Sequence, residues 1–313
     1  MLDPALADRA LGAIWGSAVG DALGAPYEFH PPIAAEEPVV LRSSELWEEG
    51  EWTDDTSMAV VVLRELAAGR SLNDATTLGR IVHAWKGWAE GAKDVGNQTR
   101  AVLSQVTVPT EALSRAAAYR VHLENGGRSA GNGSLMRTGP VALAHLGLGG
   151  EDAAWKAAAR LSELTHHEKD ATQACQLWTV AIRQAILTGR LDFRTGLNRL
   201  PAADAEVWSQ RLQEAEEGQP ADFANNGWVV TALQAAVSAI HHGLNLQDIL
   251  ERAVRAGYDT DTVAAIAGSL AGAVHGASAL PQAWVGALHG WPGMSASDLA
   301  ELATTALREN GAI

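Results

Sequence analysis

Two short runs of carboxylates and hydroxyls are the part of this sequence best suited to chemistry. Residues 52–57 read Trp-Thr-Asp-Asp-Thr-Ser, and residues 257–262 read Gly-Tyr-Asp-Thr-Asp-Thr. Hard divalent cations bind several oxygen ligands that converge on one point, and each run offers such oxygens. Each run also stands where a helix is expected to begin, so capping of that helix is the simpler explanation of either run taken alone.

The two runs share a further property, because each precedes one of the least charged predicted helices. Buried carboxylates need neutralisation. Four carboxylates brought together would repel one another unless cations stood between them. Such a group would be a two-metal oxygen site, made of Asp54, Asp55, Asp259 and Asp261. Their spacing along the chain does not show whether they meet.

A glycine-rich segment gives the third signal. Residues 131–137 read Gly-Asn-Gly-Ser-Leu-Met-Arg. Glycines let the backbone approach a ligand closely, and a helix expected to begin at Ser134 would point free N–H groups at a phosphate. A loop and helix start without any ligand is the alternative, because many loops read Gly-x-Gly.

Isolated carboxylates and histidines add weaker candidates. Glu28 and Asp94 could transfer protons, although either could equally be a surface acid. His166 could contact a ligand, whereas His241 and His242 are interpreted as ordinary helix-end residues. The sequence contains no His-Glu-x-x-His motif, and the histidine pairs lack zinc-type spacing with other ligands.

The elements that must position these residues are predicted to be helices. Helical periodicity dominates, and alternating β-branched runs are nearly absent, so we expect an all-α chain of about a dozen helices in one domain, residues 1–313, without an extended sheet. A loop is expected over 30–52, and an acidic, poorly periodic region over 200–224. The first helix follows Asp3-Pro4 and the next begins near Thr53. The others are expected near 73–90, 97–106, 110–122, 134–146, 151–164, 168–188, 226–242, 246–256, 260–275 and 296–308.

The first predicted helix carries four glycines at intervals of four residues: Gly12, Gly16, Gly20 and Gly24. That spacing places bare backbone along one face of the helix. Each glycine costs roughly 1 kcal/mol relative to alanine, so the stripe indicates close packing or the approach of a ligand. We favour helix–helix packing for Gly12 and Gly16.

Composition restricts the classes of function. The formal net charge of −14 disfavours a sequence-independent nucleic-acid binder. The one cysteine, Cys175, excludes an intrachain disulfide, fits a reducing compartment and is interpreted as a core residue. Residues 262–297 lack charged side chains, but histidines and prolines interrupt them, so we predict a buried helix and no membrane span. The N-terminus lacks signal-peptide features, and we expect a cytoplasmic protein.

Taken together, the motifs resemble those of the ADP-ribosylglycohydrolase family. They occur in the family order from about residue 10 to 285, so the resemblance covers nearly the whole chain. Each motif is modest alone, and their combination is specific. The segments that carry it are residues 16–28 (Gly-Ser-Ala-Val-Gly-Asp-Ala-Leu-Gly-Ala-Pro-Tyr-Glu), 52–56, 131–137, 225–230, 259–268 and 270–276.

The resemblance implies a compact, orthogonal all-α bundle with two divalent cations, Mg²⁺ or Mn²⁺, in a central cleft. As metal ligands it implies Thr53, Asp54, Asp55, Asp259, Asp261 and Thr262. Near the diphosphate and adenosine it implies Gly131, Asn132, Gly133, Ser134 and His166, with the amides of residues 131–134 holding the diphosphate. Gly96 is a further candidate for substrate binding. In catalysis, Asp54, Asp55 or Asp94 would accept a proton from water, and Glu28 would assist the leaving group or gate the cleft.

The implied activity is metal-dependent hydrolysis of the N- or O-glycosidic bond between ADP-ribose and a modified target, with free ADP-ribose as product. We favour ADP-ribosylated protein arginine as the target, because Trp228 and its neighbours resemble the bacterial members. Tyr258 departs from the family pattern, in which many members have glycine, and this leaves the substrate subclass open. The alternatives are a related hydrolase of a free nucleotide or an ADP-ribosylated nucleobase, and a non-catalytic member that only binds ADP-ribose.

Overall fold

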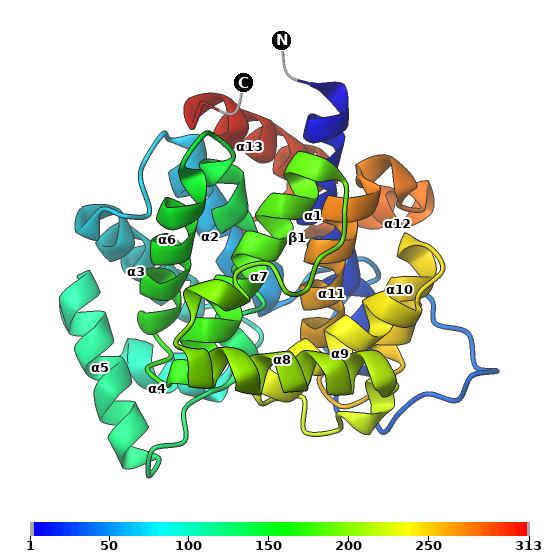
Figure 1. Cartoon of the computed structure of the whole chain (residues 1–313), viewed down its shortest axis with the longest axis horizontal. Helices are drawn as coiled ribbons and strands as arrows, with labels where there is room; N and C mark the ends of the chain where they lie inside the picture. The colour runs from blue at the N-terminus through cyan, green and yellow to red at the C-terminus, as the bar shows by residue number, and fades with distance from the viewer. Residues whose placement is uncertain (1–2, 312–313) are drawn as a thin grey trace.

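The computed structural model describes residues 3–311, and most of them are helical (Figure 1). The α-helices are α1 Pro4–Gly24, α2 Asp54–Ala67, α3 Ala75–Ala89, α4 Asn97–Gln105, α5 Glu111–Glu124, α6 Gly150–Glu163, α7 Lys169–Thr188, α8 Ala202–Glu217, α9 Val229–His242, α10 Leu246–Val254, α11 Thr260–His275, α12 Gln282–Ala287 and α13 Ala296–Glu309. The 3-10 helices are η1 Ala25–Tyr27, η2 Asn132–Ser134, η3 Gly139–His145, η4 Leu197–Arg199, η5 Pro220–Asp222 and η6 Ala277–Ala279.

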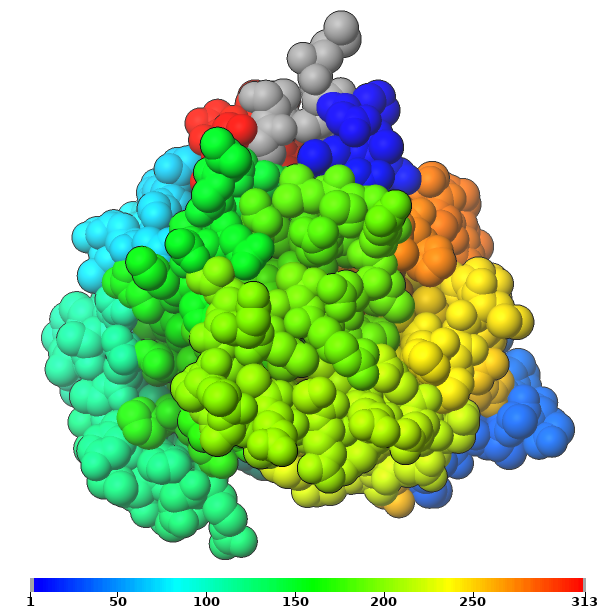
Figure 2. Space-filling view, in the orientation of Figure 1, coloured from blue at the N-terminus to red at the C-terminus, as the bar shows by residue number. Residues whose placement is uncertain are grey.

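The predicted all-α class is confirmed. Among the described residues, regular sheet is limited to β1 His289–Gly290 and β2 Met294–Ser295, which pair antiparallel. The expected loop over 30–52 contains no helix, and part of it projects at the lower right of both views (Figures 1 and 2). The organisation of residues 1–313 as one domain stays a prediction.

Helices α1 and α11 form the centre of the packing. A Cβ atom on Gly16 would lie 2.3 Å from the carbonyl oxygen of Gly268, and one on Gly20 would lie 2.2 Å from that of Ala264. Such distances leave no room for any side chain. The glycine stripe therefore brings the two backbones into direct contact, which confirms the packing interpretation.

The remaining helices enclose this pair. Helix α11 is buried from Thr260 to Ala273, and it also contacts α7, α9 and α10. This confirms the prediction of a buried core helix, and no helix among residues 3–311 is long and apolar enough to span a membrane. Cys175, on α7, is fully buried as predicted. Figure 2 shows α7 and α8 covering the centre of one closely filled face.

The α-helix predicted over 134–146 is wrong. This segment contains the end of η2, turns, and then η3, which has Pro140 in its first turn. Proline lacks an N–H donor and clashes with the preceding turn of an α-helix, so it disfavours a regular α-helix through this position. No α-helix begins at Ser134, and the expected helix N-terminus for a phosphate is therefore not formed there.

The acidic region over 200–224 contains a helix that the sequence pattern did not predict. Helix α8 buries Trp208, Leu212 and Ala215 and leaves most of its other side chains in contact with solvent. These three buried residues are spaced by four and then three positions, as in a helix. They form only one narrow apolar stripe among many charged residues, so the helical period in the sequence is weak. The short helix α12 was not predicted either.

Candidate active site

Helix α1 fixes the start of α2 through a buried carboxylate. Asp21 is fully buried and accepts hydrogen bonds from the backbone N–H of Thr53 (2.9 Å), from that of Thr56 (2.9 Å) and from the Thr56 hydroxyl (2.6 Å). Burial raises the pKa of Asp21 to about 6 although these donors oppose the rise. Sequence analysis gave Asp21 no role. The signal for it was a charged residue within the glycine stripe of an apolar helix.

The start of α2 presents two carboxylates in different environments. Thr53 caps the helix and accepts from the N–H of Asp55 at 3.4 Å. Asp54 is partly exposed, and its Oδ2 accepts from the N–H of Gly96 at 3.4 Å. Asp55 is only 1% exposed. Its Oδ1 accepts from the Thr262 hydroxyl at 3.2 Å, whereas its Oδ2 is buried with no hydrogen-bond partner among the described residues.

The start of α11 reaches the same place. Asp259 stands at the N-cap position and accepts at Oδ2 from the Nδ2 of Asn132, 2.8 Å away. The Oδ1 of Asn226 accepts a hydrogen bond from the backbone N–H of Asp259 at 3.1 Å. Asp261, in the first turn, is 4% exposed, and its Oδ1 accepts from the N–H of Thr262. The structure therefore brings together two helix starts that are about two hundred residues apart in the sequence.

Two separate segments with left-handed backbone meet where Glu28 lies beside the α11 carboxylates. Phe29 and Tyr258 both have positive backbone φ angles, 65° and 61°, which residues other than glycine rarely adopt. Their backbones join where the N–H of Phe29 donates to the carbonyl oxygen of Tyr258. The positive φ at Tyr258 gives a physical reason for glycine at this position in many family members. The tyrosine side chain is 41% exposed and does not line the cleft.

Carboxylate oxygens of Glu28, Asp259 and Asp261 lie within 4.8 Å of one another and could hold a metal ion. Burial, followed by the charges of Asp259 and Asp94, raises the pKa of Glu28 to about 9. Burial and the charge of Asp94 raise the pKa of Asp54 to about 7.

The pKa values of Asp55 and Asp261 are also raised well above the usual range, chiefly by burial. Bound cations would offset both the desolvation of these carboxylates and the repulsion between them. The unpartnered Oδ2 of Asp55 would then have a cation as its partner. The donor set of hard oxygens fits Mg²⁺ or Mn²⁺.

The glycine loop over 131–133 forms another part of the cleft wall, and amide side chains hold it and the neighbouring segments in place. Gln98 donates from its Nε2 to the carbonyl oxygens of Ser129 (2.8 Å) and Thr165 (3.0 Å). The backbone N–H of Asn132 is engaged with the carbonyl oxygen of Gly227. Sequence analysis missed Gln98, because a lone glutamine inside a helix has no distinctive pattern.

A buried arginine and a threonine orient His166. The guanidinium of Arg137 donates to the Thr165 hydroxyl at 2.6 Å and stacks on Trp85, with its carbon 4.2 Å from the ring centroid. The Thr165 hydroxyl accepts from Arg137, so its own proton is free for the Nδ1 of His166, 2.7 Å away. The tautomer of His166 that accepts this proton on Nδ1 carries its own proton on Nε2. Burial and the nearby Arg137 charge lower the pKa of His166 well below its usual value, so the ring is neutral.

These walls enclose a cleft of about 500 Å³. Most of the predicted site residues line it: Glu28, Asp54, Asp94, Gly96, Gly131, Asn132, Gly133, His166, Asp259, Asp261 and Thr262. Thr53 and Asp55 are buried and do not line the cleft. The Ser134 hydroxyl turns into the core, where Ser162 and Cys175 donate to it. The catalytic and binding roles of all these residues stay predictions.

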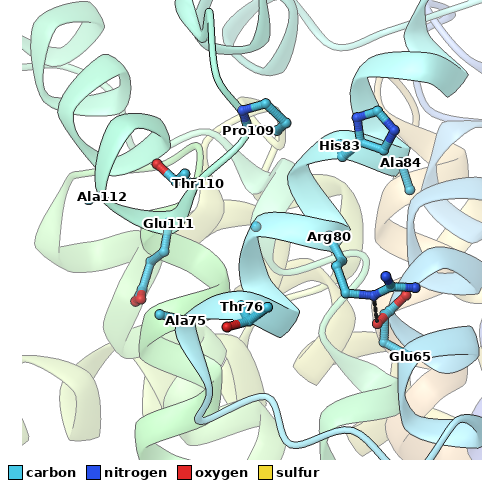
Figure 3. Close-up of a pocket in the computed structure, with 11 residues that line it drawn as sticks. Glu65, Ala75, Thr76, Arg80, His83, Ala84, Pro109, Thr110, Glu111 and Ala112 are labelled. Atoms are coloured by element: carbon cyan, nitrogen blue, oxygen red, sulfur yellow. Dashed lines mark hydrogen bonds and ion pairs between the residues drawn. The ribbon is translucent and has the colours of Figure 1, made fainter.

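A larger groove, of about 650 Å³, lies between α3 and α5 (Figure 3). Its acidic residues are already paired with arginines. Glu65 accepts from Arg80 at 2.9 Å, and Glu111 forms a salt bridge with Arg160 at 2.6 Å. The groove shares no residue with the cleft, and we assign no chemistry to it.

Comparison with known proteins identifies the fold and the family. A family model described as ADP-ribosylglycohydrolase matches residues 2–312. The chain belongs to the ADP-ribosylglycohydrolase family. It is therefore an enzyme of the ADP-ribosylglycohydrolase type, and the family predicted from the motifs is confirmed.

Relatives and solved structures agree with this membership. The ADP-ribosyl-[dinitrogen reductase] glycohydrolase of Rhodospirillum rubrum is 30% identical over 297 residues, which cover 92% of each protein. The ADP-ribosylarginine hydrolase Tri1 of Pseudomonas putida is 29% identical over 289 residues, covering 89% of this chain and 73% of the relative. A solved structure titled "ADP-ribosylglycohydrolase-related protein complex" superposes with a TM-score of 0.72 at 26% identity, covering 97% of this chain and 99% of that one.

Proposed function

We propose that this ADP-ribosylglycohydrolase hydrolyses the N-glycosidic bond between ADP-ribose and the guanidinium of a modified protein arginine. Two divalent cations, Mg²⁺ or Mn²⁺, would be held by carboxylates and hydroxyls from the two helix starts. The observation that carries the proposal is the convergence of these carboxylates on one cleft, with a buried Asp55 oxygen that has no partner within the described chain. Support for arginine comes from the relatives, two of which are named as ADP-ribosylarginine hydrolases.

The protein's own residues divide the remaining work. The loop over 131–133, with the Nε2–H of His166, would bind the diphosphate, remote from the bond that breaks. When bound, the cations would supply Lewis acidity that orients the ribose hydroxyls and makes water more acidic. Asp54 or Asp94, both on the cleft wall, would accept a proton from the attacking water.

Glu28 is proposed as the acid for the leaving group. Glu28 lines the cleft, and burial, the largest cause of its raised pKa, favours the protonated carboxyl, which would donate to the nitrogen that leaves the anomeric carbon while the other carboxylates hold the cations. The water oxygen bonds to that carbon as the carbon–nitrogen bond breaks, and the reaction passes through an oxocarbenium-like transition state, as in other glycoside hydrolysis. The products are ADP-ribose and unmodified arginine.

The test is release of ADP-ribose from arginine-ADP-ribosylated protein, first with Mg²⁺ or Mn²⁺ and then with EDTA. We expect release that requires the metal. The double variant D259N/D261N should abolish release with the fold retained, and near-normal turnover would overturn the assignment. Release only from serine-linked or nucleobase-linked substrates would refute arginine as the target, and release of phosphate would identify a nucleotide hydrolase.

A matched control separates metal binding from helix capping. Asp248 and Asp298 also stand in the first turns of helices, α10 and α13, and neither lines the cleft. The variant D248N/D298N should lose some thermal stability through weaker caps and retain turnover. Equal loss of activity in both double variants would show that the α11 carboxylates act only as caps.

A further inference from the structure

A second, smaller cavity adjoins the cleft. It has a volume of about 220 Å³ and shares Asp54 and Asp94 with the cleft wall. This volume is below the usual range of nucleotide-sized or drug-sized pockets, roughly 300–1,000 Å³, and suits a single side chain. Its lining consists of Trp47, Glu51, Trp52, Thr53, Asp54, Ser57, Trp88, Gly91, Ala92, Lys93, Asp94 and Trp291.

The lining combines aromatic rings with negative charge. Four of the chain's eleven tryptophans stand here, and Trp47, Trp52 and Trp88 are at most 7% exposed. The lining also contains three carboxylates and one lysine. Tryptophan faces attract cations, most strongly where water is excluded, so this lining is suited to a positively charged group.

The protein's own Lys93 shows how a cation is held. Its Nζ lies 5.1 Å from the centroid of the Trp47 ring. The same atom donates to both carboxylate oxygens of Glu51, at 2.7 and 2.6 Å, and to the carbonyl oxygen of Leu46 at 3.0 Å. Glu51 Oε2 also accepts from the N–H of Glu48 at 2.9 Å, which holds the carboxylate in place. The Lys93 side chain is 42% exposed and can leave without disturbing the core.

We propose that this tryptophan-lined cavity is the subsite for the guanidinium of the target arginine. This subsite rests on the function proposed above, and its residues would select the arginine linkage. The incoming guanidinium displaces Lys93, stacks on Trp47 and donates to both oxygens of Glu51. The glycosidic nitrogen then faces the cleft that Glu28 lines, past the wall that the cavity and the cleft share.

A guanidinium fits this cavity better than the alternative leaving groups. Its planar fork matches the two oxygens of Glu51, and its flat face stacks on an indole ring. The hydroxyl of a serine target is neutral, so it would leave Glu51 paired with Lys93 and the tryptophan faces unused. The subsite therefore predicts a preference for arginine-linked over serine-linked ADP-ribose.

The first test is direct binding, by calorimetry, of butylguanidine to the full chain with saturating Mg²⁺. Butylurea, which has nearly the same shape without the charge, is the matched ligand. We expect butylguanidine to bind and butylurea not to bind. Trp47→Leu should weaken butylguanidine binding about tenfold, because it removes the stacking face. Lys93→Met should tighten binding at least threefold, because it removes the internal competitor, and a misfolded variant cannot mimic this gain.

Kinetics give the second readout. Trp47→Leu should raise KM for arginine-ADP-ribosylated peptide about tenfold and leave the affinity for ADP-ribose unchanged, because the free product lacks the guanidinium. Equal butylguanidine affinity in the wild type, Trp47→Leu and Lys93→Met would overturn the subsite, as would failure of the wild type to bind it. Butylguanidine binding without hydrolysis of arginine-linked substrate would refute the proposed function and still support a guanidinium site in this cavity.

Discussion

The substitution Gly24→Ala tests whether the contact between α1 and α11 sets the position of the carboxylates that we propose bind metal. A Cβ atom at residue 24 would lie 2.5 Å from the Cα and the N of Asp261 and 2.5 Å from the carbonyl oxygen of Thr260. An ordinary van der Waals contact needs about 3.4 Å, so α11 must move by about 1 Å. All three atoms belong to the backbone and cannot turn aside as a flexible side chain would.

The magnitude follows from two opposing effects. Overpacking of this kind costs about 1–3 kcal/mol, and alanine recovers up to roughly 1 kcal/mol of helix propensity. We therefore expect a net loss of up to about 2 kcal/mol in the free energy of unfolding. The effect on catalysis should be larger, because a misplacement of about 1 Å in a reacting constellation costs about 100-fold in rate.

The assays are thermal unfolding and the kcat/KM for release of ADP-ribose from arginine-modified protein. Gly87→Ala is the matched control, because Gly87 lies within α3 and a Cβ there would meet no atom within 4 Å. This control should raise the melting temperature slightly and leave kcat/KM unchanged. Wild-type stability and activity in Gly24→Ala would refute the claim that the glycine contact positions Asp261.

Two further predictions concern His166 and the buried carboxylates. Thr165→Val should raise the Kd for ADP-ribose about tenfold and change the nitrogen chemical shifts of the His166 ring, since it removes the hydroxyl that fixes the tautomer, whereas Thr165→Ser should retain both. Unchanged nitrogen chemical shifts of the His166 ring in Thr165→Val would show that the Thr165 hydroxyl does not fix the tautomer. Folded-state pKa values raised to about 9 at Glu28 and about 7 at Asp54 mean that the metal-free folded protein binds protons that the unfolded chain has released. The contribution of these groups to stability is therefore present at low pH and is lost as the pH rises from about 4 to about 9. Added Mg²⁺ should raise the melting temperature more at about pH 8 than at about pH 5, and an equal rise at both would contradict this account.

Local patterns in the sequence predicted which residues are candidates for the chemistry and which helices bear them. The glycine interval of four residues predicts a bare helix face, and the structure places that face against α11. Threonine and aspartate before an apolar run predict a helix start, and α2 and α11 begin there. These signals are readable because helix capping and helical periodicity depend on residues at most a few positions apart.

Tertiary packing decided which of these residues meet. Glu28 lies beside Asp259 and Asp261 because the segments that contain Phe29 and Tyr258, each with a positive φ angle, are hydrogen-bonded to each other. The hydroxyl of Ser134 turns into the core, although its sequence neighbours line the cleft.

The tryptophan-lined cavity shows the same limit, because it draws on residues 47 to 94 and on Trp291. Such contacts depend on how whole helices pack against one another. The free energy that favours these contacts comes from burying the core that the helices share, and it cannot be predicted from any short stretch of sequence.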